Sequence, residues 1–224
     1  MPISFPSIQR ARRRKAKVFC IGLGKTGTTS LEKALVGLGF RAGNQRAGER
    51  LVDDWGRRDF RRIAALCETA DAFQDVPFSL PYTFAVLDQL FPNARFILTS
   101  RDSAEQWYQS LTQFHSQLWA DGERIPTVED LQQAVYLEPG YVWRSWQLVY
   151  DTPADDPYNR EYMLAFYERH LANVREYFRT TPGKLLEVNV ANPADYRRLC
   201  EFLGKEPAAD GFPWLNKTNT HSGT

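Results

Sequence analysis

A glycine-rich segment near the N-terminus brings together the residue types that bind anions. Residues 22–29 read Gly-Leu-Gly-Lys-Thr-Gly-Thr-Thr and follow a short apolar run at 17–22. Glycines let the backbone approach a ligand closely, and the first amides of a helix have no partners within that helix and attract negative charge. Lys25 adds a positive charge, and hydroxyl donors come from Thr26, Thr28 and Thr29. A tight turn with a surface lysine is the alternative, but it leaves this concentration of residues unexplained. The sequence therefore predicts an anion site here.

The elements that must position this segment are short strands that alternate with helices. Apolar runs predict strands at 17–22, 40–42, 70–76, 94–100 and 184–190. Apolar residues recur at helical spacing in the segments 30–39, 60–67, 82–91, 103–118, 161–178 and 193–203. This alternation is typical of a parallel sheet with helices on both faces. We therefore expect an α/β fold whose central, mainly parallel sheet has about five strands.

The composition excludes several classes of protein. The 224 residues carry 28 basic and 27 acidic side chains, so the chain lacks the basic field of a nucleic-acid-binding protein. Segment 1–16 is rich in arginine and is predicted to be a solvated basic arm, with a contact to a polyanion as the alternative. Three scattered histidines give no zinc-ligand spacing. No apolar run is long enough to span a membrane, and no secretory signal is evident. The three cysteines form no paired motif, which is typical of a reducing compartment. These observations predict a cytoplasmic location.

The glycine-rich segment differs from the loop of nucleotide triphosphatases. That loop reads G-x-x-x-x-G-K-[ST] and would need a glycine where Phe19 stands. The segment instead resembles the 5′-phosphosulfate loop of sulfotransferases, commonly P-K-S-G-T-T, through Gly24, Lys25, Thr26, Gly27, Thr28 and Thr29. It is most similar to a bacterial branch whose loop reads G-x-G-K-T-G-T-[TS]-S. This resemblance, which extends over most of 17–218, implies a P-loop-like three-layer sandwich. It also implies 3′-phosphoadenosine-5′-phosphosulfate (PAPS) as sulfuryl donor, PAP as product and no metal.

The resemblance also indicates which residues hold the 3′-phosphate of the donor. In the family, an arginine at a strand end and a serine about two helical turns later do so. Arg101 follows the run 94–100, and Ser110 stands nine residues later, one more than the usual spacing, so that Gln109 takes the nominal place. Ser103, the predicted helix cap, is the alternative hydroxyl. Because both motifs follow parallel strands, they should meet at the carboxyl edge of the sheet, where open α/β folds bind ligands.

Transfer to an acceptor hydroxyl or amine requires a general base. Asp75 ends the predicted strand 70–76 and should face the same edge, and the bacterial branch has a similar D-x-P there; a helix cap is the alternative role. Glu49 is the second candidate, because related enzymes place a glutamate just after the second strand. His115 and His170 fall inside predicted helices, where a surface or core role is expected instead.

Two further segments are interpreted through the resemblance. Residues 212–218 match the F-P-x-x-N segment of the bacterial branch, which implies that Asn216 and Lys217 close over the nucleotide; a tail pinned by its aromatic residues is the alternative. Residues 119–160 are predicted to form a lid-like insertion in one domain that spans 17–224. The acceptor specificity of sulfotransferases normally resides in such a region.

The sequence thus predicts a PAPS-dependent sulfotransferase. Its acceptor would be a small molecule, a glycan or a lipid, and its oligomeric state is left open. Two alternatives from other classes remain: a P-loop kinase of a small molecule, and a non-catalytic nucleotide-binding module.

Overall fold

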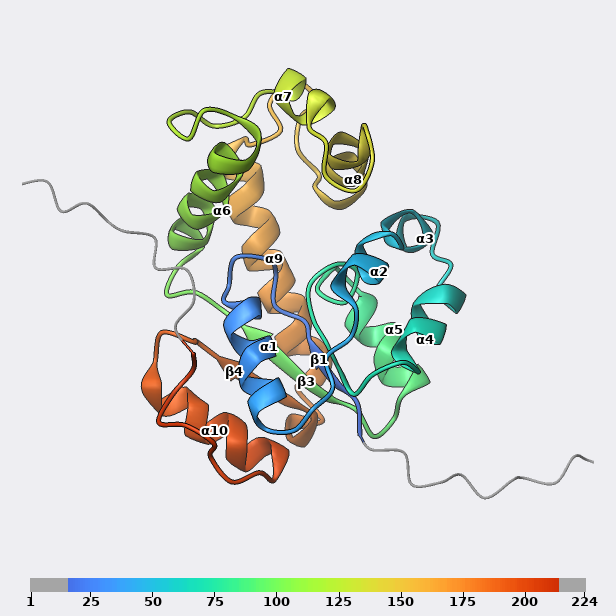
Figure 1. The fold of residues 1–224 in the computed structure, drawn as a ribbon, viewed down its shortest axis with the longest axis vertical. Coiled ribbons are helices and arrows are strands. Elements are labelled where there is room, and N and C mark those ends of the chain that lie inside the picture. The colour runs from blue at the N-terminus through green and yellow to red at the C-terminus, as the bar shows by residue number, and fades with distance from the viewer. Residues whose placement is uncertain (1–15, 214–224) are drawn as a thin grey trace, which may run out of the picture.

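The computed structural model describes residues 16–213. Within them, four parallel strands form one sheet in the order β2-β1-β3-β4 (Figure 1). Their bounds are β1 (Val18–Cys20), β2 (Ala72–Phe73), β3 (Arg95–Thr99) and β4 (Leu185–Val188). The predicted α/β fold with a central parallel sheet is confirmed. Most of the predicted basic arm lies outside the described residues.

The predicted number of strands was one too many. Residues 40–42 do not form a strand within the described chain, because only Ala42 makes an isolated parallel bridge with Ala72. The extended segment ends at once, since Asn44 caps the next helix by accepting a hydrogen bond from the amide of Ala47. The segment therefore contributes this one bridge to the edge of the sheet and no strand.

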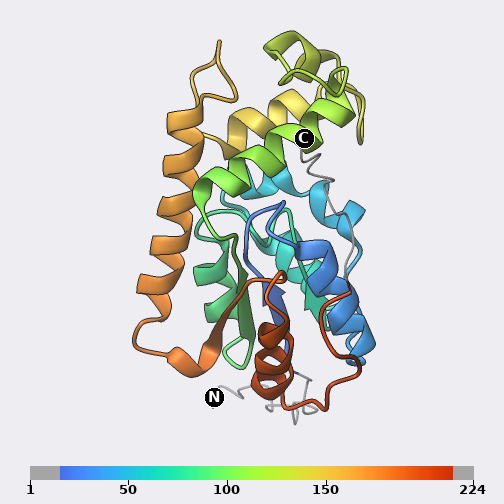
Figure 2. The ribbon, with the colours of Figure 1, turned by 90° about the vertical axis from the view of Figure 1, so that its left-hand side faces the viewer.

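Helices cover both faces of the sheet because alternate residues of each strand point to opposite sides. Val18 and Cys20 of β1 pack in a core with α1 (Thr28–Gly37) and α10 (Pro193–Leu203). Phe19 and Ile21 pack on the other face with α5 (Thr83–Leu90) and α9 (Arg160–Phe178). Figure 2 shows these layers side by side, with α9 on one side of the sheet and α1 on the other.

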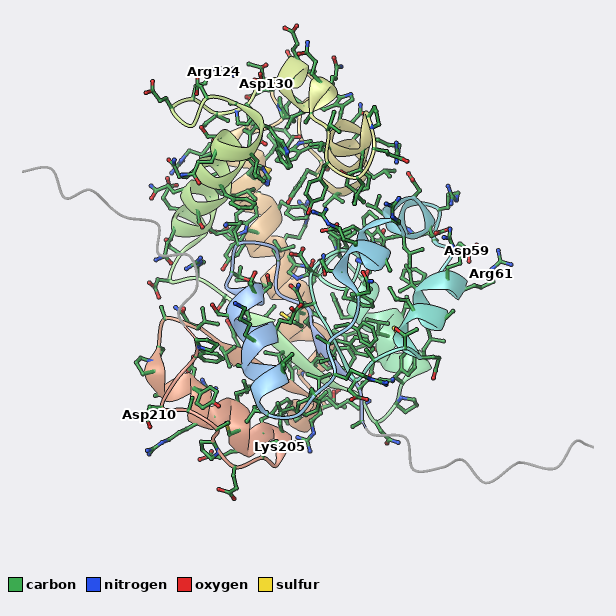
Figure 3. The ribbon with its side chains drawn as sticks, viewed as in Figure 1. Asp59, Arg61, Arg124, Asp130, Lys205 and Asp210 are labelled. Atoms are coloured by element: carbon green, nitrogen blue, oxygen red, sulfur yellow. The ribbon has the colours of Figure 1, made fainter. Side chains whose placement is uncertain are left out.

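The remaining helices lie around the carboxyl edge of the sheet, except α4, which lies beside α5 at the level of the strands (Figure 1). They are α2 (Gln45–Glu49), α3 (Val52–Gly56), α4 (Arg61–Cys67), α6 (Ala104–Trp119), α7 (Val128–Gln133) and α8 (Tyr141–Val149), and a short 3₁₀ turn (Pro182–Lys184) precedes β4. Residues 120–159, which we call the α6–α9 region, contain α7 and α8. A capping box starts α7, and its Asp130 also pairs with Arg124 (Figure 3). No helix of residues 16–213 is long and apolar enough to cross a membrane.

Candidate active site

The segment between β1 and α1 is held against the sheet at two glycines. A Cβ atom on Gly22 would lie 2.1 Å from Oγ1 of Thr99, so only glycine lets β1 end this close to β3. Gly27 has φ of 100°, and a Cβ atom there would lie 2.3 Å from the side chain of Val190, beyond β4. Gly27 is also the N-cap of α1 and has no side chain to cap it. The first amides of α1 therefore stay available to an anion.

Hydrogen bonds made by Thr26 stabilise the inside of this loop. Its hydroxyl is fully buried, donates to the carbonyl of Leu23 at 2.6 Å and lies 2.5 Å from the hydroxyl of Thr99. Its amide donates to the same Leu23 carbonyl at 3.3 Å. The side chain of Thr26 thus faces the core, whereas Thr29, in the first turn of α1, is exposed.

Lys25 and Arg101 come together beside the loop. Nε of Arg101 donates to the carbonyl oxygen of Lys25 at 2.8 Å, and Nζ of Lys25 lies 3.6 Å from the ring centre of Phe114. Burial lowers the pKa of both groups, and the charge of Arg101 lowers the pKa of Lys25 further. Neither forms an ion pair with a carboxylate of residues 16–213. Asp75 and Asp102 act on these two cations only from beyond ion-pair distance, so both half-buried groups can pair directly with an anion.

One face of α6 packs on the loop. The indole Nε1 of Trp107 donates to the carbonyl of Gly24 at 2.9 Å. Phe114 lies about two turns further along the same face, in contact with Lys25. Trp107 is fully buried. Ser110 follows Trp107 by three residues and precedes Phe114 by four, so it shares the face that contacts the loop.

The two other polar residues considered on this helix are engaged elsewhere. Ser103 accepts a hydrogen bond from the amide of Gln106 at 3.1 Å and caps α6, as the sequence predicts. Gln109 is exposed and donates to Glu105 at 3.1 Å. Of the three, Ser110 is the one whose hydroxyl has no hydrogen-bond partner within the described chain and shares the loop-facing side, so it remains the predicted partner of the 3′-phosphate.

Asp75 lies next to the loop, as its place after β2 suggests. Its Oδ1 is 3.6 Å from the position that a Cβ atom on Gly24 would take, and it accepts a hydrogen bond from the amide of Val76 at 3.0 Å. Burial raises the pKa of Asp75 to about 6, with a smaller increase from the charge of Glu49 and an opposing effect of Lys25. No helix begins at Asp75, whose φ is 59°, so the alternative role of a helix cap does not apply.

Glu49 is also near this edge, but its carboxylate is already paired. It forms an ion pair with Arg46 at 3.0 Å and accepts hydrogen bonds from Gln45 and from the hydroxyl of Tyr136 at 3.0 Å. Its backbone carbonyl accepts the hydroxyl of Tyr141 at 2.9 Å. Glu49 therefore links α2 to the α6–α9 region, and it is less free than Asp75 to accept a proton.

The two histidines of the helices are buried, as a core role requires. Burial lowers the pKa of His115 to about 3 and that of His170 to about 4, so both rings are neutral. Nδ1 of His115 lies 2.9 Å from the hydroxyl of Tyr158, and Nε2 of His170 lies 2.8 Å from the carbonyl of Ile21.

Sequence reasoning missed several residues that complete the site. Tyr167 of α9 accepts a hydrogen bond from the amide of Arg101 at 2.9 Å and so fixes the turn after β3. Gln74, just before Asp75, donates to Glu32 of α1 at 3.1 Å. Phe114 could have been found, because it recurs at helical spacing after Trp107; no pattern in the sequence points to Tyr167. Asn216 and Lys217 lie outside the described residues.

The family assignment follows from a comparison with known domains. A family model for the sulfotransferase domain matches residues 17–221. The chain belongs to the sulfotransferase family. The match spans every strand and helix described above, including the loop after β1 and the turn after β3. No curated protein matches the chain. Membership assigns the protein to the transferases that move a sulfuryl group, and in residues 16–213 no three His, Cys, Asp or Glu side chains gather in a way that could hold a metal ion.

Proposed function

We propose that the protein transfers the sulfuryl group of PAPS to a hydroxyl or amine of a small-molecule, glycan or lipid acceptor. The observation that supports PAPS most is the meeting of Lys25 and Arg101 beside the loop. Both cations are half-buried, and within residues 16–213 neither forms an ion pair, since Asp75 and Asp102 act on them only from a greater distance. A donor with phosphates at two ends of a nucleoside would supply the missing negative charge.

The two ends of the donor would bind to different elements. The 5′-phosphosulfate would lie at the uncapped start of α1, where amides of residues 27–29 and the hydroxyl of Thr29 can donate to it. The 3′-phosphate would pair with Arg101, with Ser110 on the adjoining helix face as a second donor. Both positions lie at the carboxyl ends of β1 and β3, which are neighbours in the sheet.

In the transfer step, the acceptor oxygen or nitrogen forms a bond to sulfur while the bond from sulfur to the bridging phosphate oxygen breaks. The acceptor's proton passes to the carboxylate of Asp75, and PAP leaves. Lys25 would neutralise the charge that develops on the bridging oxygen, which requires its ammonium group to exchange the face of Phe114 for the donor. A carboxyl group with a pKa of about 6 is mostly ionised at neutral pH and is a stronger base than an ordinary aspartate.

The kinase alternative is weakened by the position of Thr26. In a nucleotide triphosphatase loop, the hydroxyl after the lysine binds Mg²⁺. Here that hydroxyl is fully buried and bonded to Leu23 and Thr99. The three cysteines, which are buried and unpaired, support the proposal of a reducing, cytoplasmic location.

The test combines binding with turnover. The protein is titrated with PAP and with Mg²⁺-ATP, and it is then incubated with radiolabelled PAPS and a panel of phenols, sugars, lipids and amines. We expect PAP to bind more tightly and at least one acceptor to become labelled. Binding of Mg²⁺-ATP with no binding of PAP would refute the proposal in favour of a kinase. Tight binding of PAP with no labelled product from any acceptor class would favour a non-catalytic module.

A further inference from the structure

The backbone of Lys25 has a conformation that a lysine rarely adopts. Its φ is 70°, in the left-handed region that favours glycine. Such a conformation persists only where the surrounding structure holds it, and it is common at functional sites. The backbone conformation of a residue also sets the direction in which its side chain leaves the chain. Whatever holds the φ of Lys25 therefore also directs its ammonium group.

Two hydrogen bonds hold the peptide groups on either side of the Lys25 Cα atom. The peptide group before it is held at the carbonyl of Gly24, which accepts from Nε1 of Trp107 at 2.9 Å. The peptide group after it is held at the carbonyl of Lys25, which accepts from Nε of Arg101 at 2.8 Å. Within residues 16–213, neither carbonyl accepts a second hydrogen bond. The orientation of both peptide groups thus depends on two side chains, one in α6 and one just before it.

Tyr167 joins these two side chains from α9, which packs beside α6 (Figure 1). Its ring stacks on the indole of Trp107, with ring centres 4.9 Å apart and planes 22° from parallel. Its hydroxyl accepts from the amide of Arg101 at 2.9 Å. These contacts close a ring that runs from one side of Lys25 to the other. Trp107 is fully buried and Tyr167 is 2% exposed, so neither can contact a bound donor itself.

We propose that Trp107 is a positioning residue for Lys25, and that Tyr167 supports it. The indole N–H group keeps the Lys25 backbone in its left-handed conformation and thereby directs the ammonium group to the oxygen on which charge develops. This inference rests on the proposed function, because Lys25 acts on the leaving group there. Trp107 touches neither donor nor acceptor, and its effect on the transfer step passes through Lys25.

The first test observes Lys25 directly and needs no turnover. Reductive methylation with ¹³C-formaldehyde labels the lysine side chains of the full chain, and Lys25→Arg identifies the Lys25 signal. Because Nζ lies 3.6 Å from the ring centre of Phe114, the ring should shift the signal of its methyl protons upfield. In Trp107→Phe and Tyr167→Phe, the signal should move toward that of an exposed lysine. Trp55→Phe should keep it; this matched control removes a buried indole N–H group that has no hydrogen-bond partner within the described chain.

The second test is a double-mutant cycle on the turnover of labelled PAPS. Trp107→Phe should lower kcat about tenfold, the factor that corresponds to the loss of one hydrogen bond. The dissociation constant of PAP should stay nearly unchanged, because the amides at the start of α1 are intact. In the Lys25→Ala background, Trp107→Phe should have almost no further effect, since it has no lysine left to position. Trp55→Phe should leave kcat unchanged in both backgrounds.

Two results would overturn the proposal. The first is a Lys25 signal that keeps its upfield shift in both Trp107→Phe and Tyr167→Phe. Tyr167→Phe removes one oxygen atom and keeps the stacked ring, so it decides the question if Trp107→Phe fails to fold. The second is an equal fall of kcat with and without Lys25, which would assign Trp107 to the stability of the loop alone. A lack of turnover in the unaltered protein would refute the proposed function instead, and the Lys25 signal would still decide whether Trp107 positions the lysine.

Discussion

Replacing Asp75 with asparagine should make the protein more stable and less active at the same time. Burial raises the pKa of this carboxyl from 3.8 to about 6, which corresponds to about 3 kcal/mol of unfavourable free energy in the folded state when the group is ionised. Because the folded pKa lies above the unfolded one, this penalty is absent below about pH 4 and complete above about pH 6. Asparagine carries no charge and keeps an oxygen that can accept from the amide of Val76. It also tolerates the φ of 59° at this position.

The free energy of unfolding of Asp75→Asn, measured by urea titration at pH 8, should therefore exceed that of the unaltered protein by about 1–3 kcal/mol, with the upper bound set by the raised pKa. Below about pH 3, where Asp75 is protonated in both the folded and the unfolded state, the difference should vanish. Turnover should fall by roughly 10²-fold or more, because the general base is lost, whereas the dissociation constant of PAP should stay unchanged. A variant that is destabilised at pH 8, or that keeps its turnover, would show that Asp75 is not a desolvated base.

Glu49→Gln is the matched control for this variant. The carboxylate of Glu49 is paired with Arg46 and Tyr136, so its removal should lower the stability and leave most of the turnover. If Glu49→Gln abolishes turnover while Asp75→Asn retains it, the base is Glu49.

Three further variants test the proposed donor site. Lys25→Ala should lower turnover by about 10²-fold or more without unfolding the protein, because the leaving group loses its counter-charge; turnover with labelled PAPS and far-ultraviolet circular dichroism check this. Arg101→Ala should remove most of an about tenfold or greater preference for PAP over 5′-AMP, measured by titration, since one charge-assisted contact is lost; an unchanged preference would place the 3′-phosphate elsewhere. Gly27→Ala should weaken PAP binding and stability, because its φ is 100° and its Cβ atom would meet Val190; trimming Val190 to alanine should restore part of the stability but not relieve the backbone strain.

Much of the fold could be predicted because the strands of a parallel sheet are continuous apolar runs separated by helical periodicity. The run at 94–100, for example, became β3 (Arg95–Thr99). The sequence did not reveal that residues 40–42 stop at a single bridge, because their apolar character alone does not show where the next helix is capped. The opposite packing of Val18 and Phe19 was also hidden, since both faces of β1 are buried and both residues are apolar.

The meeting of Lys25 and Arg101 was predictable for a general reason: both follow parallel strands, and such strands present their carboxyl ends at one edge. The side chains that surround these two residues were not predictable. Phe114 of α6 reaches Lys25, and Tyr136, between α7 and α8, reaches Glu49, because segments distant in the sequence pack together. The orientation of Thr26 was hidden for the same reason, because its hydroxyl faces Thr99 of β3 and not the outer side of the loop. Contacts between segments distant in the sequence leave no periodic pattern.

Because Lys25 lies near Asp75, the pKa of the proposed base should depend on whether the donor is bound. Lys25 favours the ionised form of Asp75, whereas Glu49 and Glu32 raise the pKa of Asp75. A bound phosphosulfate beside Lys25 would offset that cation and raise the pKa of Asp75 above about 6, and so strengthen the base in the complex with donor. The pH profile of kcat/KM for the acceptor, measured at low PAPS, reports the pKa of Asp75 in the free protein. The pH profile of kcat reports its pKa in the complex with donor. The acid limb of kcat should therefore have its midpoint at a higher pH than the limb of kcat/KM. Coincident midpoints, or the reverse order, would mean that the donor's charge does not lie between Lys25 and Asp75.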